Sequence, residues 1–321
     1  MDRNDLPFSE VLDRLFNEPD VSIALIYRLS DMSGEEMKRF TERWPEQEDR
    51  RRRIIARHMA DISEENFIVD FSPAFRFLLS DPAREVRLAA LDGLWDTSNT
   101  DVVPPIIDLM QADADEDVRA SAAATLGHFV LMGEWGQIDH DVADRIVEAL
   151  LGQFDHSDTA ESVRRATVES LGNAAHDRIP DIIGESYHRG DEAMQLSAMF
   201  AMGRSADRRW VSIINDEMLN TSPEMRVEAA RAAGNIGASD CVDRLIELLD
   251  DEELDVQLAA VTALGQIGSE RAYETLQRFA EDAETDRLAE AVEDALDEIE
   301  WLGGEIDLSL FEWDEDDDVI A

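Results

Sequence analysis

The stretch DEDVRASAAATLG at residues 115–127 decides the fold, because related stretches recur along the chain. With Val118 taken as the anchor, five other copies begin at an equivalent apolar residue: Val86, Val163, Met194, Met225 and Val256. Successive anchors are 32, 45, 31, 31 and 31 residues apart. A sustained period of about 20 to 50 residues is typical of a solenoid, whose units pack only on their neighbours.

Each copy has the spacing of an amphipathic helix. The residues four and eight places after the anchor are small or apolar, which puts them on one helical face with the anchor. They are Ala90, Ala122, Thr167, Ala198, Ala229 and Ala260, then Leu94, Leu126, Leu171, Met202, Ala233 and Leu264. Five copies continue with a glycine that suits close packing near a helix end, at Gly127, Gly172, Gly203, Gly234 and Gly265. A second amphipathic segment precedes the anchor helix, as at 102–111, 142–154, 241–251 and 272–282.

These helix pairs predict an all-α fold, an α-solenoid that winds as a right-handed superhelix. Weaker anchors at Val21, Arg52 and Leu288 extend the register at both ends. We therefore expect about seven to nine helix pairs, with atypical units at the ends, where a repeat faces water.

We expect three regions along the chain. Residues 1–62 form an N-terminal helical capping region with degenerate repeats, and residues 63–302 form the repeat solenoid. The longest interval between anchors places an insertion near 128–141. Residues 303–321 form an acidic-hydrophobic tail. We expect it to stay solvated, to compete with a partner for the binding surface, or to dock on a neighbouring copy in the same way.

The repeats resemble the short, PBS-lyase-type (E-Z) variety of the HEAT-repeat superfamily, whose pattern is D-x-x-V-R-x-x-A-x-x-x-L-G. The stretch from Asp115 to Gly127 matches the whole pattern. The resemblance covers roughly residues 70–300 and implies a helical-repeat fold. It implies no particular activity, since such repeats occur in bilin lyases, regulators and scaffolds.

The composition limits the partners. The chain has 74 acidic and 29 basic residues, a net charge of −45, so we expect no non-specific nucleic-acid binding. The acidity fits either a saline environment or attraction to a basic partner. No apolar run is long enough for a membrane span, the N-terminus lacks a signal peptide, and a single cysteine, Cys241, fits a reducing compartment. We expect a cytoplasmic protein with no membrane contact.

Catalytic chemistry is hard to find in the sequence. None of the six histidines lies in an H-E-x-x-H motif or at metal-ligand spacing with another. HEAT-like deoxyhypusine hydroxylases carry His-Glu dipeptides as iron ligands, and this sequence has no such dipeptide. Glycines are spread one per repeat, which is no phosphate-binding loop. We expect no enzyme activity, no metal and no cofactor, and we expect Cys241 to be buried.

An arginine follows the anchor in four copies, at Arg87, Arg119, Arg164 and Arg226. These residues could form an anion track. A structural ladder is the better interpretation, because an arginine beside the core stripe of each unit can bridge to an acid of the next.

A partner surface is expected on the exposed side of the anchor helices, which line the concave groove of such solenoids. Places six and ten after the anchor give the basic-aromatic set Phe200, Arg204, Arg231 and Asn235, close to Trp210. A basic-aromatic set is unusual in so acidic a chain and offers a surface that a partner can bind. We therefore predict a non-enzymatic scaffold or adaptor. Its partner is a protein segment, basic or carrying an acidic motif.

The insertion supports an alternative. It is either an elongated helix with a lid over the groove or a loop that plugs a wider gap, and we favour the plug. As a lid, Phe129, Met132 and Trp135 would cover a small ligand or chromophore, with His128 or His140 assisting. That arrangement implies a bilin-lyase-like or chaperone-like factor. The partner, the pathway and the oligomeric state cannot be read from the sequence.

Overall fold

The computed structural model describes residues 6–66, 68–281 and 285–303. These residues form α-helices and short 3-10 helices and contain no β-strand, which confirms the all-α prediction. Among them, no helix combines the length and apolar character that crossing a membrane requires. The predicted tail lies outside the described residues, apart from Gly303 at the end of the last helix.

The helices follow one another as the repeat pattern predicts. The α-helices are α1 Phe8–Asn17, α2 Ile23–Ile26, α3 Gly34–Arg43, α4 Asp49–Glu65, α5 Ser72–Leu78, α6 Arg84–Asp92, α7 Val103–Ala112, α8 Glu116–Glu134, α9 His140–Asp155, α10 Glu161–Leu171, α11 Ile179–Arg189, α12 Glu192–Arg204, α13 Val211–Glu217, α14 Pro223–Ile236, α15 Val242–Leu248, α16 Leu254–Ile267, α17 Glu270–Ala280 and α18 Asp286–Gly303. The 3-10 helices are η2 Tyr27–Leu29, η3 Trp44–Glu46, η4 Thr100–Val102, η5 Arg208–Trp210 and η6 Ser239–Cys241.

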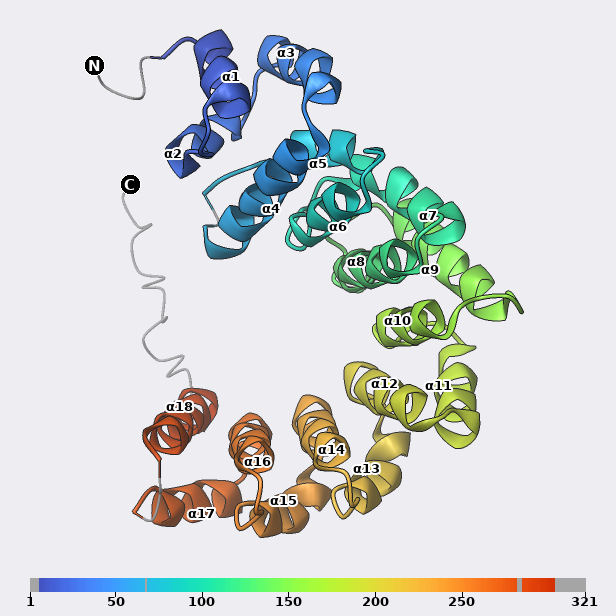
Figure 1. The fold of residues 1–321 in the computed structure, drawn as a ribbon. Helices are drawn as coiled ribbons and strands as arrows, with labels where there is room; N and C mark the ends of the chain where they lie inside the picture. The colour runs from blue at the N-terminus through green and yellow to red at the C-terminus, as the bar shows by residue number, and fades with distance from the viewer. Residues whose placement is uncertain (1–5, 67, 282–284, 304–321) are drawn as a thin grey trace, which may run out of the picture. The chain divides into compact units, whose positions relative to one another are not determined.

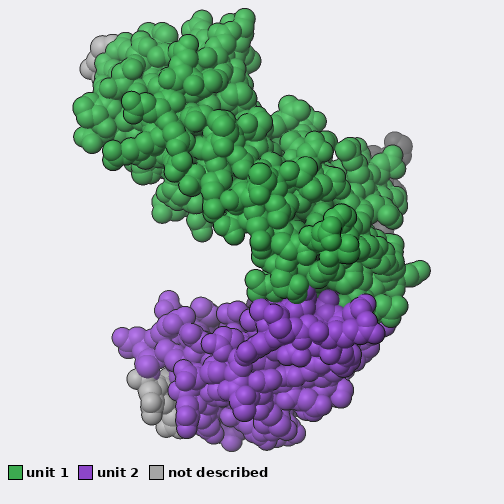
Figure 2. Space-filling model, turned by 45° about the vertical axis from the view of Figure 1, so that its right-hand side comes forward, with its two compact units in different colours: residues 1–182 green, residues 183–321 purple. Residues whose placement is uncertain are grey.

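The chain divides into two compact units, residues 1–182 and residues 183–321 (Figure 2). In the first unit, α4, α6, α8 and α10 pack side by side in one row, and α3, α5, α7 and α9 lie in a second row (Figure 1). In the second unit, α12, α14, α16 and α18 form one row, with α13, α15 and α17 behind it. Each pair of consecutive helices thus adds one unit to a two-layered stack, the architecture of an α-solenoid.

The predicted core stripe is confirmed. In all six copies the anchor and the residues four and eight places after it are at most 3% exposed. Thr167 is the polar member, and its hydroxyl donates to the carbonyl of Val163 at 2.8 Å, so its burial leaves no unmet hydrogen bond. The weaker anchors Arg52 and Leu288 also lie in buried positions on α4 and α18.

The glycines after the core stripe face the next repeat. A Cβ atom on Gly203 would lie 2.7 Å from the Cα of Ala232, and one on Gly234 would lie 2.9 Å from the Cα of Ala263. A Cβ on Gly265 would meet Ala295 equally closely, at 2.9 Å from its Cβ. Consecutive helices of the row therefore touch backbone to backbone at these points, which only glycine allows.

Two details differ from the prediction. The register at Val21 does not open a full helix, since only the four residues of α2 follow it before η2. At the insertion, neither a plugging loop nor a lid forms: the extra residues lengthen α8 to 19 residues and α9 to 16. The residues after Gly127 are HFVLM, which contain no glycine or proline, and Phe129 and Met132 among them are buried, so the helix continues where other copies end.

Candidate partner-binding surface

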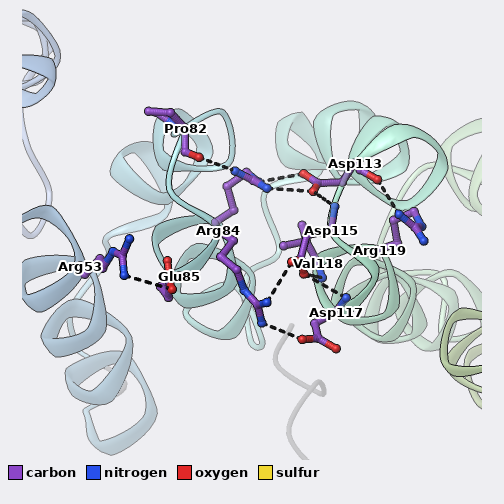
Figure 3. Close-up of polar contacts among 10 residues, drawn as sticks. Arg53, Pro82, Arg84, Glu85, Asp113, Asp115, Asp117, Val118 and Arg119 are labelled. Carbon is purple, nitrogen blue, oxygen red and sulfur yellow. Dashed lines mark hydrogen bonds and ion pairs between the residues drawn. The ribbon is translucent and has the colours of Figure 1, made fainter. Parts of the chain in front are cut away.

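The arginine ladder is engaged within the fold. Arg87 donates from Nη1 to the carbonyl of Asp81 at 2.8 Å, which ties the helix to the turn before it. Its Nε lies 2.8 Å from the carboxylate of Asp113, at the start of the next repeat. Arg119 in turn donates to the carbonyl of Asp113 at 2.7 Å (Figure 3).

Exposed ion pairs also join each helix of the row to the next repeat. Arg53 of α4 pairs with Glu85 of α6 at 3.1 Å, and Arg84 of α6 pairs with Asp115 and Asp117 at 2.9 and 2.6 Å (Figure 3). Each such pair on the surface contributes little, about 0–1 kcal/mol. Together with the contacts of Arg87 and Arg119, these pairs support the interpretation of the arginines as a structural ladder.

The second unit repeats the arrangement. Both terminal nitrogens of Arg226 are used, one on the carbonyl of Asn220 at 2.9 Å and the other, with Nε, on the carboxylate of Asp251 at 2.8 Å. Burial acts to raise the pKa of Asp251, but hydrogen bonds from Arg226 and from the amide of Glu253 hold it below the usual value. Arg164 donates to the carbonyls of Phe154 and His156 and lies over the Phe154 ring.

The predicted partner residues divide into exposed and buried ones. Phe200 and Arg204 project from α12, and Arg231 and Asn235 project from α14. The Phe200 ring is 38% exposed, and the Arg204 guanidinium lies 5.9 Å from its centroid. Because Gly203 packs directly on Ala232, these two helical edges adjoin. We name Phe200, Arg204, Arg231 and Asn235 the α12–α14 surface.

Trp210 does not belong to this surface. It ends η5, is only 7% exposed, and approaches Gly184 of α11, so the prediction that it contacts a partner is wrong. The two arginines before it also pair within the chain, Arg208 with Asp240 at 2.9 Å and Arg209 with Asp207 at 2.6 Å. A tryptophan at the start of an outer helix fills the space between layers, a role that the sequence alone does not reveal.

The predicted lid residues do not form a lid. Phe129 is fully buried and Met132 is 6% exposed, because both lie on the core side of the lengthened α8. Trp135 is 65% exposed at the end of that helix. A cavity of 570 Å³ does open nearby, but its lining includes Val130, Glu134 and His140 and none of the three predicted lid residues.

Two features of many catalytic sites, a metal-ligand cluster and a reactive thiol, are missing from the described part of the chain. No cluster of three or more histidine, cysteine or acidic side chains there is arranged to hold a metal ion. Cys241 is fully buried, as predicted, and burial raises the pKa of its thiol to about 11. The thiolate needed for nucleophilic chemistry is therefore scarce near neutral pH.

The burial of Cys241 predicts that its thiol reacts slowly in the folded protein. In the native protein we expect iodoacetamide to leave this thiol unmodified at pH 8, whereas labelling should be complete once urea unfolds the chain. Mass spectrometry of the intact protein, with glutathione as a reactivity control, measures both. Rapid labelling of the folded protein would show that Cys241 is accessible and would contradict its place in the core.

Sequence reasoning missed two features. Asp81 lies outside the repeat pattern, but its carboxylate accepts from the Trp44 indole at 2.7 Å and from Arg52 at 2.9 Å. Trp95 is a large aromatic that is 42% exposed. It stands nine places after Val86, where five other copies have glycine, and this departure from the repeat was the available signal.

Comparisons with known proteins give one family match and several distant structural likenesses. The family model for HEAT repeats matches residues 72–172 and 216–297. Among solved structures, the Escherichia coli protein YibA is 15% identical, covering 88% of this chain and 99% of its own, with a TM-score of 0.46. An engineered protein is 16% identical over 91% and 90%, with a TM-score of 0.42. Human deoxyhypusine hydroxylase is 18% identical over 75% and 98%, with a TM-score of 0.32. No curated protein matches the sequence.

Proposed function

The chain belongs to the HEAT-repeat family, and from that premise we propose that it is a non-enzymatic scaffold that binds a protein partner through the α12–α14 surface. Stacked helical repeats create extended surfaces that bind other proteins. We place the protein in the cytoplasm, where a reducing environment suits its single cysteine.

The observation that carries the proposal is a basic and aromatic surface within an otherwise acidic chain. In a chain with a net charge of −45, the outward side of α12 and the neighbouring side of α14 present a phenylalanine, two arginines and an amide. The Arg231 side chain is 62% exposed, and among the described residues its ion pair is a long one, 3.6 Å, with Glu228. Solubility does not require such a patch, and exposed aromatic-arginine combinations dominate binding energy when a partner covers them.

The chemistry of the surface indicates the partner. Arginine pairs with carboxylates through two parallel hydrogen bonds, and an aromatic ring offers an apolar contact beside them. We therefore propose a segment that carries an acidic residue next to an apolar one. The surrounding negative field would disfavour a segment with additional acids, which restricts the choice of partner.

A double substitution tests this proposal. We expect Phe200→Ala/Arg231→Ala to weaken recovery of the partner from native lysate by roughly 30-fold or more, because a single hot-spot residue contributes about 2 kcal/mol. The matched control is Trp301→Ala/Arg189→Ala, which removes an aromatic that is 81% exposed and an arginine whose side chain is 76% exposed. Equal recovery by both double variants would remove the α12–α14 surface from consideration.

The cavity near α8 and α9 favours a second candidate function, the holding of a small ligand. Its volume of 570 Å³ lies in the range of ligand pockets, and Glu134, His140 and His176 contribute polar groups to its lining. The absorbance spectrum of freshly purified protein checks this directly. A visible band that is lost when the cavity is filled by Ala143→Trp would support a bound chromophore, and a spectrum of protein alone would contradict it.

A further inference from the structure

Trp95 replaces a packing glycine of the repeat. In other copies the glycine nine places after the anchor lies against the residue seven places after the next anchor, as Gly127 does with Ser170. An indole cannot enter that contact, since a single Cβ on Gly127 would already lie 2.7 Å from the Ser170 hydroxyl. The copy that contains Trp95 therefore has to end its helix differently.

The structure shows how it ends. Helix α6 stops at Asp92, and Gly93 follows at a place where a Cβ would lie 2.2 Å from the Phe75 ring. The chain then turns, with the amide of Trp95 donating to the carbonyl of Asp92 at 3.3 Å. The indole emerges 42% exposed instead of packing between repeats.

Two cavities share Trp95 in their lining. One has a volume of 470 Å³ and is lined by Arg57, Ala60, Glu64 and Asp92 besides the indole. The other, of 250 Å³, lies among small polar side chains and includes Asp96. Either cavity has room for one long side chain such as that of arginine.

The charges in these cavities are only partly compensated. Arg57 donates to Asp61 and to Asp92, at 2.7 Å in each case, and so offsets one of their two negative charges. Glu64 and Asp96 are exposed and form no ion pair with any described residue. Each cavity is thus lined by part of the Trp95 indole and by one carboxylate that forms no ion pair with a described residue.

We propose that Trp95 and its two cavities bind the guanidinium group of an arginine in a partner protein. A guanidinium stacks on an indole and pairs with a carboxylate at its edge, and Glu64 and Asp96 line these cavities together with the exposed part of Trp95. The chain itself uses arginine on aromatic rings in the same way, at Phe16 and Phe154. This site lies in residues 1–182 and is independent of the α12–α14 surface.

Nuclear magnetic resonance of the full chain, labelled with ¹⁵N at its tryptophan indoles, tests the proposal. The probe is the capped peptide Gly-Arg-Gly, and the control peptide has citrulline, which keeps the shape without the charge. We expect Gly-Arg-Gly to shift the Trp95 indole resonance, assigned by Trp95→Phe, with saturation, and the citrulline peptide to shift it far less. Glu64→Gln and Asp96→Asn should each weaken binding by about two- to five-fold, the effect of an exposed ion pair.

The exposed Trp135 and Trp301, at 65% and 81%, are internal controls for general attraction to an acidic surface. Equal shifts at all three indoles, or equal binding of the citrulline peptide, would overturn the proposal. So would unchanged affinity in both carboxylate variants. A loss of binding in Phe200→Ala/Arg231→Ala has no bearing on this site, so the two claims fail separately.

Discussion

Replacing Asp81 by alanine is expected to lower the free energy of unfolding by about 3–5 kcal/mol, the cost of leaving a buried charge without its partner. The Asp81 side chain is 2% exposed and the Arg52 side chain is 11% exposed. Besides Arg52 and the Trp44 indole, the carboxylate accepts from the amide of Ala83 at 2.8 Å. Urea unfolding, followed by circular dichroism, measures the loss.

The control for this prediction is Asp108→Ala, which removes an exposed carboxylate from α7 in the same unit. Its effect should stay within about 0.5 kcal/mol, as for most surface substitutions. Asp81→Asn keeps the shape and one acceptor oxygen, but it loses the charge and the second acceptor, so its effect should fall between the two. Equal stability of Asp81→Ala and Asp108→Ala would contradict the idea that Asp81 joins three parts of the first unit.

Replacing Gly234 by valine is expected to destabilise the second unit by about 3 kcal/mol, the upper part of the range for overpacking. The new Cβ would lie 2.9 Å from the Cα and 3.1 Å from the Cβ of Ala263, so backbone would have to move. Helices α14 and α16 would separate there, and hydrogen exchange of both should rise. The measurement is urea unfolding combined with exchange detected by mass spectrometry.

Gly184→Ala is the matched control, because its Cβ would meet only the Trp210 ring, at an ordinary 3.7 Å. Alanine is preferred to glycine inside a helix by about 1 kcal/mol, so this variant should be as stable as the wild type or more stable. The two glycine variants thus have opposite expected signs. Destabilisation of both to the same extent would indicate a general intolerance of the helices and not a close contact at Gly234.

The repeat register was predictable because it depends on local spacing. Anchors such as Val118 and the residues four and eight places later are buried as the periodicity requires, and the glycines pack closely as their type suggests. The same periodicity gave the order of the helix pairs. Helical spacing needs no knowledge of which distant residues meet.

The sites were less predictable because they depend on distant contacts. Trp210 and Phe200 both looked like surface aromatics near arginines, but only the packing of η5 against α11 buries the first. Likewise, Trp44, Arg52 and Asp81 are far apart in sequence and converge only in the fold. At the insertion, spacing counted the extra residues correctly but could not decide between a loop and a longer helix.

Photo-crosslinking from position 200 tests the central claim, that the α12–α14 surface binds a protein partner, most directly. A photoreactive phenylalanine analogue replaces Phe200 in the full chain in cells, and a second variant carries it at Leu219, which is 61% exposed in the same unit. We expect irradiation to give a discrete adduct from position 200, lost when Arg231→Ala is added, and none of the same mass from position 219. No adduct from position 200, or the same adduct from both positions, would contradict the claim.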